Sequence, residues 1–303
     1  MAVTRFAFKL DNDTNYIDLA QCMSMVQRTM IRQKQNFTVL GGQVVDNPST
    51  PAAIKISTAP DFWYIRAAIN RCFKAWKNSR SRTLKNAELD GVKNATAKFA
   101  DFKITLNGVG SNSNKLPVYT GESNITEFGS TSGQPTYGEW ATASVISEEP
   151  ILMAGAPQTE FHFKIVGDHT NTYYGATKGW LVTRALPDSE YEPDMLDLDG
   201  NAVLDYKEDA LNLLHDTADG QPERLSLLYE DNDFAPYPVR DIYGNIDSAH
   251  NLALQSMSYV SSTNPSQMIP GFKALCGLIQ VQVDSNATNP ILFLDVLNTP
   301  EAF

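Results

Sequence analysis

The sequence predicts an all-β protein of sandwich or jelly-roll architecture, with a few helices in the connections between strands. About a dozen short segments alternate in the manner of strands or form short apolar runs, and each is bounded by Pro, Gly, Asn or Asp. Several long polar loops separate these segments, as in elaborated sandwiches. A parallel α/β fold would need a helix after nearly every strand, and the sequence lacks that pattern.

The length of 303 residues allows a large core, in one elaborated domain or in two of about 150 residues each. A hydrophobic content of 42% and a charged content of 19% are typical of globular proteins rather than disordered ones. The three cysteines, Cys22, Cys72 and Cys276, form neither a metal-binding pair nor a disulfide framework, so we expect buried, reduced thiols. No signal peptide and no apolar run of membrane-spanning length is present, which predicts synthesis in a cytoplasm.

The first sixty residues predict three strands and one helix. Residues 5–10 and the segments Phe37–Val45 and Ala52–Ile56 read as strands, the last two divided by a turn of Asp, Asn, Pro and Ser. From Tyr16 to Lys34 the apolar residues keep helical spacing, and basic residues stand near the end, where they suit the helix dipole.

The strongest helix prediction follows Pro60 and Asp61, a pair typical of helix starts. Apolar residues then recur at spacings of three and four, which predicts one buried face. These residues are Phe62, Ile65, Ile69, Cys72, Phe73 and Trp76. A basic connection, Arg80–Lys85, follows, and the period then changes to two in a strand over Phe102–Asn107.

The rest of the chain predicts further strands and one more helix, at Asp205–His215 in a very acidic stretch that runs from Pro187 to Asp233. The segment Leu252–Val260 could equally be helical. The expected strands are Trp140–Ile146, Ile151–Met153, Phe161–Ile165, Gly179–Leu186, Leu225–Tyr229, Val239–Tyr243, Leu252–Val260, Ala274–Val283 and Ile291–Leu297.

A weak internal repeat suggests two related halves. Residues 161–171 echo residues 6–15 with one insertion, each beginning Phe-x-Phe-Lys and ending in a polar turn. Chance similarity between two amphipathic strands is the alternative. With Ala154–Pro157 as the linker, the prediction is a double jelly roll, that is, two β-sandwiches side by side: an N-terminal jelly roll in residues 1–153 and a C-terminal one in residues 158–303.

Charge is distributed unevenly along the chain, whose formal net charge is −11. Residues 1–150 carry 17 Lys and Arg against 13 Asp and Glu, whereas residues 151–303 carry 7 against 22. Nine of the basic residues fall within residues 66–98. They predict either a surface for nucleic acid or anionic lipid, or simply a solvated helix face. The residues expected on that surface are Lys74, Lys77, Arg80, Arg82 and Lys85.

The sequence contains none of the common catalytic or cofactor motifs. It has no nucleophile motif such as Gly-x-Ser-x-Gly, no phosphate-binding glycine loop, and no HxH or HExxH spacing among its four histidines. Paired carboxylates are expected by composition in so acidic a chain. We therefore predict a protein that is not an enzyme and has no cofactor.

One acidic span resembles a calcium-binding EF-hand loop. Oxygen-bearing side chains stand at positions 1, 3, 5, 9 and 12 of the span, but its glycine is fourth rather than sixth. The alternative, which we favour, is a surface turn that caps the helix beginning at Asp205, with no metal bound. The weak calcium candidates are Asp197, Asp199, Asn201, Asp205 and Glu208.

The chain also resembles a known protein family. The resemblance rests on the aromatic and basic helix Phe62–Trp76 between strands, the segment Gly138–Ile146, the two Phe-x-Phe-Lys strand starts and the chain length. On these features the chain is similar to the double jelly-roll major capsid proteins of tailless, membrane-containing icosahedral phages, of the Flavobacterium-infecting lipid-containing type.

That resemblance implies a homotrimer that forms a pseudo-hexameric capsomer of an icosahedral shell, located in the virion. Its partners would be other copies of itself, minor capsid or vertex proteins, and internal membrane lipid or genome, reached through an inward-facing basic stretch. Two alternatives stay open: a single-jelly-roll capsid protein with large insertions, and a carbohydrate-binding or receptor-binding β-sandwich protein of a phage. The aromatic residues that favour the last are Tyr173, Tyr174, Tyr237 and Tyr243.

Overall fold

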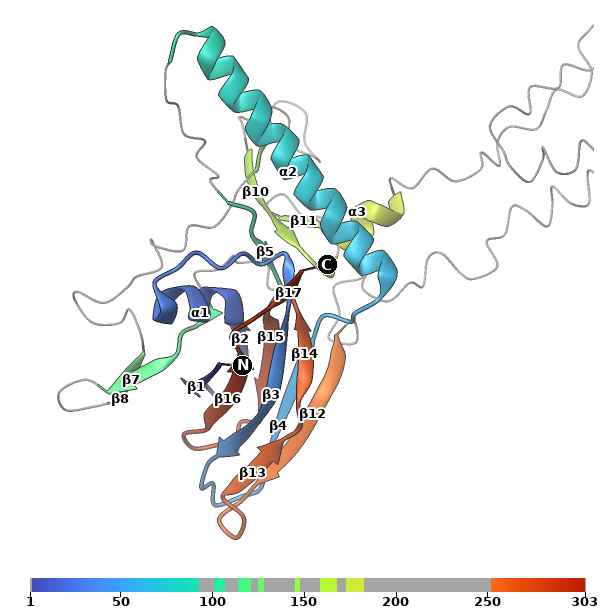
Figure 1. Cartoon of the computed structure of the whole chain (residues 1–303). Coiled ribbons are helices and arrows are strands. Elements are labelled where there is room, and N and C mark those ends of the chain that lie inside the picture. Colours follow the sequence, from blue (N-terminus) through green and yellow to red (C-terminus); the bar gives the residue numbers. More distant parts are fainter. Residues whose placement is uncertain are drawn as a thin grey trace, which may run out of the picture. The chain divides into compact units, whose positions relative to one another are not determined.

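The computed structural model of the chain describes residues 2–92, 101–106, 114–120, 125–127, 145–147, 159–167, 173–182 and 252–302 (Figure 1). The chain divides into two compact units, Met1–Trp180 with Tyr243–Phe303, and Leu181–Ile242. All the elements below belong to the first unit, except for the last two residues of helix α3. The described part is mostly β, as the sequence predicts, with antiparallel sheets and helices in the connections.

The first sheet has the order β1-β16-β3-β13, and two more strands, β14 and β17, also pair with β3. All its pairings are antiparallel; in the β1–β16 pair Phe6 lies opposite Leu294. The strands are β1 (Val3–Lys9), β3 (Gln35–Val45), β13 (Ser266–Ile269), β14 (Phe272–Leu275), β16 (Ile291–Leu297) and β17 (Glu301–Ala302).

The second sheet has the order β12-β4-β15-β2-β6. Its first four strands pair antiparallel, whereas the short β6 pairs parallel with β2. The strands are β2 (Thr14–Asp18), β4 (Ala52–Thr58), β6 (Asn114–Lys115), β12 (Ala253–Val260) and β15 (Leu278–Val283). The segment for which the sequence left helix and strand open, Leu252–Val260, is thus a strand.

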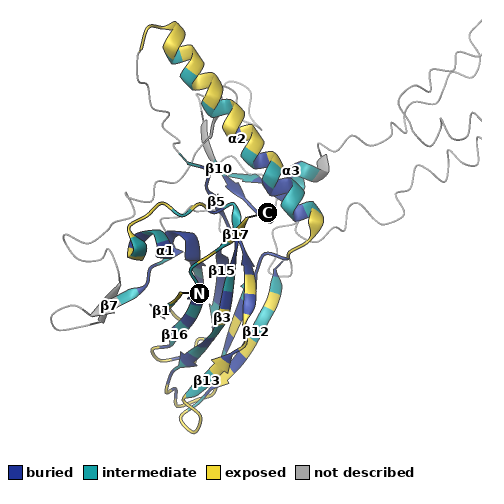
Figure 2. Ribbon diagram, viewed as in Figure 1, coloured by how far each residue is buried: buried dark blue, intermediate teal, exposed yellow. Residues whose placement is uncertain are grey.

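The two sheets enclose one hydrophobic core. Period-two alternation directs every second side chain of a strand inward. Phe6 and Phe8 of β1, Ile54 and Ile56 of β4 and Val281 of β15 are therefore buried together. Figure 2 shows β15 as mainly buried, whereas β12 and β13 carry exposed residues.

Both sheets join strands from the two ends of the chain. β1 pairs with β16, and β4 pairs with β12 and β15, so the sandwich combines residues 3–58 with residues 253–302. The expected jelly rolls of residues 1–153 and 158–303 are therefore not separate sandwiches in the described part of the chain. The alternation that predicts a strand says nothing about its partner, and a duplication is not needed to explain these strands. The linker Ala154–Pro157 lies outside the described residues.

The predicted helix over Tyr16–Lys34 is shorter than expected. Tyr16 and Ile17 lie in β2, opposite Gln280 and Ile279 of β15, and only Leu19–Gln27 forms a helix, α1. Asp18 caps α1 by accepting hydrogen bonds from the backbone amides of the next turn. The spacing Asp18-x-x-Gln21 is that of a capping box, a signal that places the helix start correctly.

The predicted strand Ala274–Val283 is in fact two strands in different sheets. Cys276 (φ 58°) and Gly277 (φ 75°) form a turn in which the Gly277 amide donates to the Ala274 carbonyl. The positive φ values break the strand and pass the chain from β14 in the first sheet to β15 in the second. A Cβ at Gly277 would lie 3.0 Å from the ring of Phe37.

The long connection between β4 and β12 carries a second layer. In this layer β10 pairs parallel with β5 and β11 and antiparallel with β9. The same connection also contains the antiparallel pair of β7 and β8, which lies beside β1 and not in this layer. The elements are α2 (Trp63–Leu89), β5 (Ile104–Thr105), β7 (Val118–Thr120), β8 (Ile125–Glu127), β9 (Val145–Ser147), β10 (Thr159–Lys164), β11 (Tyr173–Gly175) and α3 (Ala176–Val182).

Aromatic rings fill a second hydrophobic core between α2 and the strands of this layer. Phe102 contacts Phe73 and Trp76 of α2 on one side and Phe163 of β10 on the other, at centroid distances of 5.5 to 6.1 Å. Cys276, in the turn that joins β14 to β15, belongs to the same core. The second layer therefore packs against the end of the sandwich where that turn lies.

Three predictions for this layer are wrong in detail. The basic segment Arg80–Lys85 continues helix α2 instead of forming a connection. Residues 179–182, expected to begin a strand, belong to α3, because Trp180 packs on Tyr64 and this tertiary contact overrides local preference. The period of two over Phe102–Asn107 predicts a polar face opposite the apolar one, but Lys103 and Thr105 on that polar face are buried as well. The predicted elements between residues 183 and 251 lie outside the described residues.

Candidate interaction surface

Helix α2 carries all five basic residues that the sequence singled out, and its start is held by an ion pair. Phe62 takes the N-cap position in extended conformation (φ −92°, ψ 151°) and provides no side-chain cap. Asp61 instead accepts two hydrogen bonds from Arg66, from Nε at 2.5 Å and from Nη2 at 2.6 Å. Phe62 was expected in the core, but it precedes the helical face and is exposed.

The first half of α2 has one buried face. Ile65, Ile69, Cys72 and Trp76 are buried in the second core. Beyond Trp76 no residue of the helix is buried, and Figure 2 shows the second half of α2 as mainly exposed. Hydrophobic packing therefore fixes the first half, and the second half presents its side chains to solvent.

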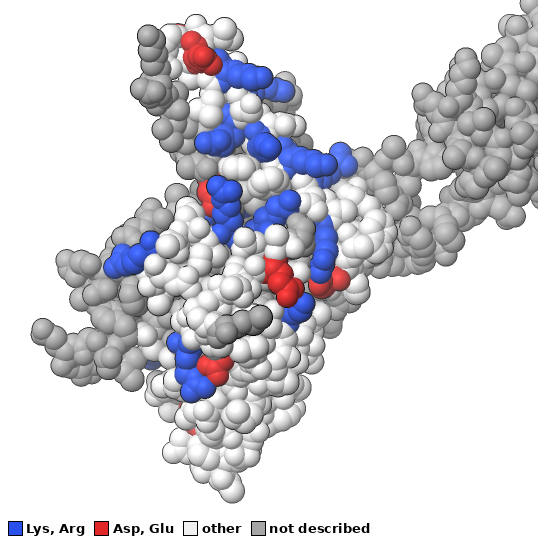
Figure 3. All heavy atoms as spheres, in the orientation of Figure 1, with Lys and Arg blue, Asp and Glu red and all other residues white. Residues whose placement is uncertain are grey.

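The exposed part of α2 is strongly basic. Within Trp63–Leu89 the sequence has seven Lys and Arg and a single acidic residue, Glu88. Figure 3 shows Lys and Arg gathered along α2, whereas the sandwich in the same view is mostly uncharged. The basic residues are thus concentrated on one helix. The fixed rise and rotation per residue of that helix set where each basic side chain projects.

Four of the five predicted residues are exposed: Lys74, Lys77, Arg82 and Lys85. In the part of the chain that the structure describes, none of these four forms an ion pair. Arg80 differs, because it is half-buried and its Nε atom is enclosed. Four of the five side chains are thus accessible on α2, whereas Arg80 lies closer to the core.

An aromatic cluster lies where α2 begins. Trp63, 67% exposed, meets the ring of Trp180 edge-on at a centroid distance of 5.5 Å, and Tyr64 stacks on Trp180 at 6.1 Å. The sequence pointed instead to other aromatic residues as exposed. Tyr173 and Tyr174 are half-buried, and the remaining two, Tyr237 and Tyr243, lie outside the described residues.

A buried polar network connects the sandwich to the second layer. The Asp18 carboxylate accepts hydrogen bonds from the amides of Ala20 (2.9 Å) and Gln21 (3.2 Å) and from Nε2 of Gln33 (2.7 Å). Gln33 also exchanges two hydrogen bonds with the backbone of Ile104 in β5. No motif links these residues in the sequence, because an isolated Gln gives no signal of its distant partner.

Burial raises the pKa of Asp18 to about 7, although the hydrogen bond from the Gln21 amide, the positive charge of Lys103 and the other donors oppose that rise. Lys103 is itself almost fully buried, and its Nζ lies 2.8 Å from Oδ2 of Asp101. A carboxyl group that titrates near neutral pH inside a structural junction makes the stability of that junction dependent on pH.

The described residues contain neither a reactive thiol nor a metal-binding cluster. All three cysteines are free and buried, as predicted, and burial raises the pKa of each thiol, to about 12 for Cys72. In this part of the chain no group of three His, Cys, Asp or Glu side chains is placed to hold a metal ion. The calcium candidates Asp197, Asp199, Asn201, Asp205 and Glu208 lie outside it, so that question stays a prediction.

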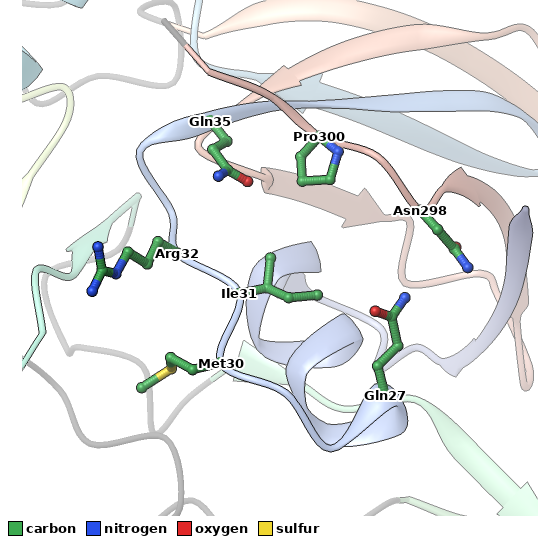
Figure 4. Close-up of a pocket in the computed structure, with 7 residues that line it drawn as sticks. All are labelled: Gln27, Met30, Ile31, Arg32, Gln35, Asn298 and Pro300. Carbon is green, nitrogen blue, oxygen red and sulfur yellow. The ribbon is translucent and has the colours of Figure 1, made fainter. Parts of the chain in front are cut away.

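A shallow hollow of about 460 Å³ lies beside α1 (Figure 4). Amide and apolar side chains line it, and Arg32 is its one charged residue. The lining residues are Gln27, Met30, Ile31, Arg32, Gln35, Asn298 and Pro300. This set has no carboxylate, thiol or imidazole that could act as acid, base or nucleophile, so the hollow does not suggest catalysis.

Comparisons with known proteins found no family model, no curated protein and no solved structure that matches this chain. None of the described helices is both long and apolar enough to cross a membrane.

Proposed function

We propose that this chain is a viral capsid protein whose sandwich is a single jelly roll with a long insertion between β4 and β12. The strand order is the observation that carries this proposal. Apart from the step from β4 to β12, the strand positions alternate between the two sheets in chain order, with β13 and β14 sharing one position. They give the orders β1-β16-β3-β13 and β12-β4-β15-β2, which are those of an eight-stranded jelly roll. The proposal keeps the capsid function that the sequence resemblance implies and takes the single-jelly-roll alternative for its fold.

The single jelly roll is favoured over the double one by the origin of the strands. One complete set of eight strand positions comes from residues 3–58 and 253–297, which leaves the connection between them for insertions. The parallel pairing of β10 with β5 and β11 also differs from the antiparallel ladders of a jelly roll. The described part of the connection therefore supports an inserted layer, not a second copy of the sandwich.

A jelly roll alone does not specify a function, so the surfaces must support the choice. The space between the sheets is filled by packed side chains, which is unlike a barrel that encloses a ligand. Leu254, Met257 and Tyr259 lie on the outer face of β12, at the edge of the second sheet, with exposed fractions of 56%, 41% and 59%. An exposed apolar stripe on an edge strand is typical of surfaces covered by another protein subunit.

The proposal includes the assembly and location that the resemblance implies. The subunit would form a homotrimer and then an icosahedral shell in the virion, with minor capsid or vertex proteins as further partners and no enzymatic activity. Negative-stain electron microscopy of the purified protein and of particles that contain it tests this function. Trimers and closed shells are the expected result, and a protein that stays monomeric at high concentration would contradict it.

A carbohydrate-binding or receptor-binding protein is the second candidate, and the aromatic cluster of Trp63, Tyr64 and Trp180 favours it. Trp63 is exposed, whereas Tyr64 and Trp180 are half-buried, and an exposed aromatic ring offers a flat apolar face on which a sugar ring can stack. A glycan-binding assay distinguishes the two functions. Glycan binding that disappears in Trp63→Ala, from a protein that does not assemble, would favour this candidate over the capsid protein.

A further inference from the structure

We infer that the exposed face of α2 binds the phosphate backbone of a nucleic acid. In the proposed capsid protein this ligand would be the packaged genome. That identification rests on the proposed function, whereas the binding itself does not.

The basic side chains of α2 form a stripe. With about 100° of rotation per residue, Arg71, Lys74, Arg82 and Lys85 project within an arc of about 80°. This arc lies roughly opposite the buried face of the helix, and all four side chains are exposed. Helical geometry therefore aligns charges that are scattered in the sequence.

The dimensions of the stripe fit a single linear polyanion. From Arg71 to Lys85 the helix rises about 21 Å, which corresponds to about six phosphates along one strand of a duplex. Asn78 and Ser81 are exposed between the basic residues, and such side chains commonly donate hydrogen bonds to phosphate oxygens. Both the charges and the neutral donors thus suit a phosphate backbone.

A membrane surface fits the same stripe less well. Helices that lie on membranes insert an apolar face beneath the headgroups. The apolar face of α2, with Ile65, Ile69 and Trp76, is already buried in the second core. Only electrostatic attraction to anionic lipid would remain, along a stripe that is one helix wide.

Nucleic-acid binding must come from this local surface, because the net charge of the chain is −11. A polyanion is repelled by the protein as a whole and attracted only where basic residues cluster. Removing charges from α2 should therefore weaken binding far more than removing the same number of charges elsewhere. This difference makes a matched comparison possible.

The test measures the fluorescence anisotropy of a labelled DNA single strand of mixed sequence, about 30 nucleotides long, with the full chain at about 50 to 200 mM salt. One variant carries Lys74→Gln, Arg82→Gln and Lys85→Gln. The control carries Lys9→Gln, Arg5→Gln and Lys273→Gln in the sandwich, where all three side chains are also exposed. Each variant loses two Lys and one Arg, and circular dichroism checks that both fold.

The wild-type chain should bind the strand with an affinity that falls steeply as salt rises. The α2 variant should bind at least about tenfold more weakly. The slope of the logarithm of its affinity against the logarithm of the salt concentration should be smaller in magnitude by about 2, since each cation lost removes about 0.7. The control should stay within about twofold of the wild type. A wild-type chain that does not bind, or a control that loses as much affinity as the α2 variant, overturns the inference.

A parallel assay uses vesicles of phosphatidylcholine with phosphatidylserine. Binding to vesicles that depends on α2, with no binding to DNA, would overturn the inference in favour of a lipid surface. Sedimentation of the same variants separates this inference from the proposed function. If the α2 variant loses DNA binding but assembles like the wild type, the result supports nucleic-acid binding by α2 and leaves the capsid function untouched. A chain that binds DNA but never assembles contradicts only the capsid function.

Discussion

Gln33 donates a hydrogen bond from Nε2 to Oδ2 of Asp18 at 2.7 Å, and both residues are buried. The same Nε2 donates to the carbonyl of Ile104, whose amide donates back to Oε1 of Gln33 at 2.7 Å. Asp18 ends β2 in the sandwich, and Ile104 belongs to β5 in the second layer. One side-chain amide therefore joins the sandwich to the second layer.

Replacing this amide should destabilise the protein strongly. Gln33→Ala removes the hydrogen bonds that Gln33 forms with Oδ2 of Asp18 and with both backbone groups of Ile104, while the amides of Ala20 and Gln21 still bind Oδ1. Each buried polar group left unsatisfied costs about 1–3 kcal/mol. We expect the free energy of unfolding, measured by urea denaturation, to fall by about 3 kcal/mol. Gln43→Ala is the control, because Gln43 donates to Ser266 from a partly exposed site and should cost at most about 1 kcal/mol. Equal losses in the two variants would argue against the junction.

The stability of the protein should depend on the protonation of Asp18. Its pKa is raised to about 7 in the folded state from an ordinary value of 3.8, so the folded state binds more protons between these values. The contribution of this group to stability is therefore fully present below about pH 4 and is lost as the pH rises through 7.

Asp18→Asn removes this titration. The free energy of unfolding of the wild type minus that of the variant should fall by a few kcal/mol between about pH 4 and pH 8, since one pKa unit corresponds to about 1.4 kcal/mol. Any constant cost of the substitution cancels, because only the pH dependence of the difference is read. A difference that stays flat over this range would show that Asp18 titrates normally.

Two neighbouring glycines offer a test of the pairing between β3 and β16. A Cβ at Gly42 would lie less than 2.5 Å from the backbone carbonyl oxygen of Phe293, whereas at Gly41 the nearest atom would be 3.4 Å away. Gly42→Ala should therefore destabilise the protein by about 2 kcal/mol or more, because backbone must move. Gly41→Ala should change stability by less than about 1 kcal/mol. Thermal denaturation of both variants decides, and a Gly42→Ala variant as stable as wild type would count against this register.

The apolar edge strand β12 should contribute to self-association. Met257→Glu places a charge on the outer face of β12 and should weaken the proposed trimer by about tenfold or more, because an interface would bury that charge without a partner. Met268→Glu makes the same change at an exposed site of β13 in the first sheet and should have little effect. Sedimentation equilibrium measures both. A trimer that tolerates Met257→Glu as well as Met268→Glu does not use this edge.

Much of the local structure could be predicted from the sequence. Strands β1, β3, β4 and β16 and the start of α2 agree with the predicted segments, because one buried face imposes a clear period on each of them. The two errors around Tyr16 and Cys276 arise where tertiary pairing or a turn with positive φ interrupts such a period.

The partners of the strands could not be predicted. β1 and β16 are separated by almost the whole chain, and period two specifies a face but no neighbour. For the candidate surface, composition was enough to find the basic residues, but their alignment depends on the helix continuing to Leu89. Gln33 was missed because its three hydrogen bonds are formed across 15 and 71 residues of sequence.

A density map of assembled particles at side-chain resolution tests the central proposal most directly, since it reports assembly and subunit fold together. The account predicts a closed shell whose subunits each contain one jelly roll, with Val3–Lys9 antiparallel to Ile291–Leu297 and the insertion between β4 and β12. Particles whose subunits contain two jelly rolls divided near residues 154–157, or a protein that forms no particles, would contradict it.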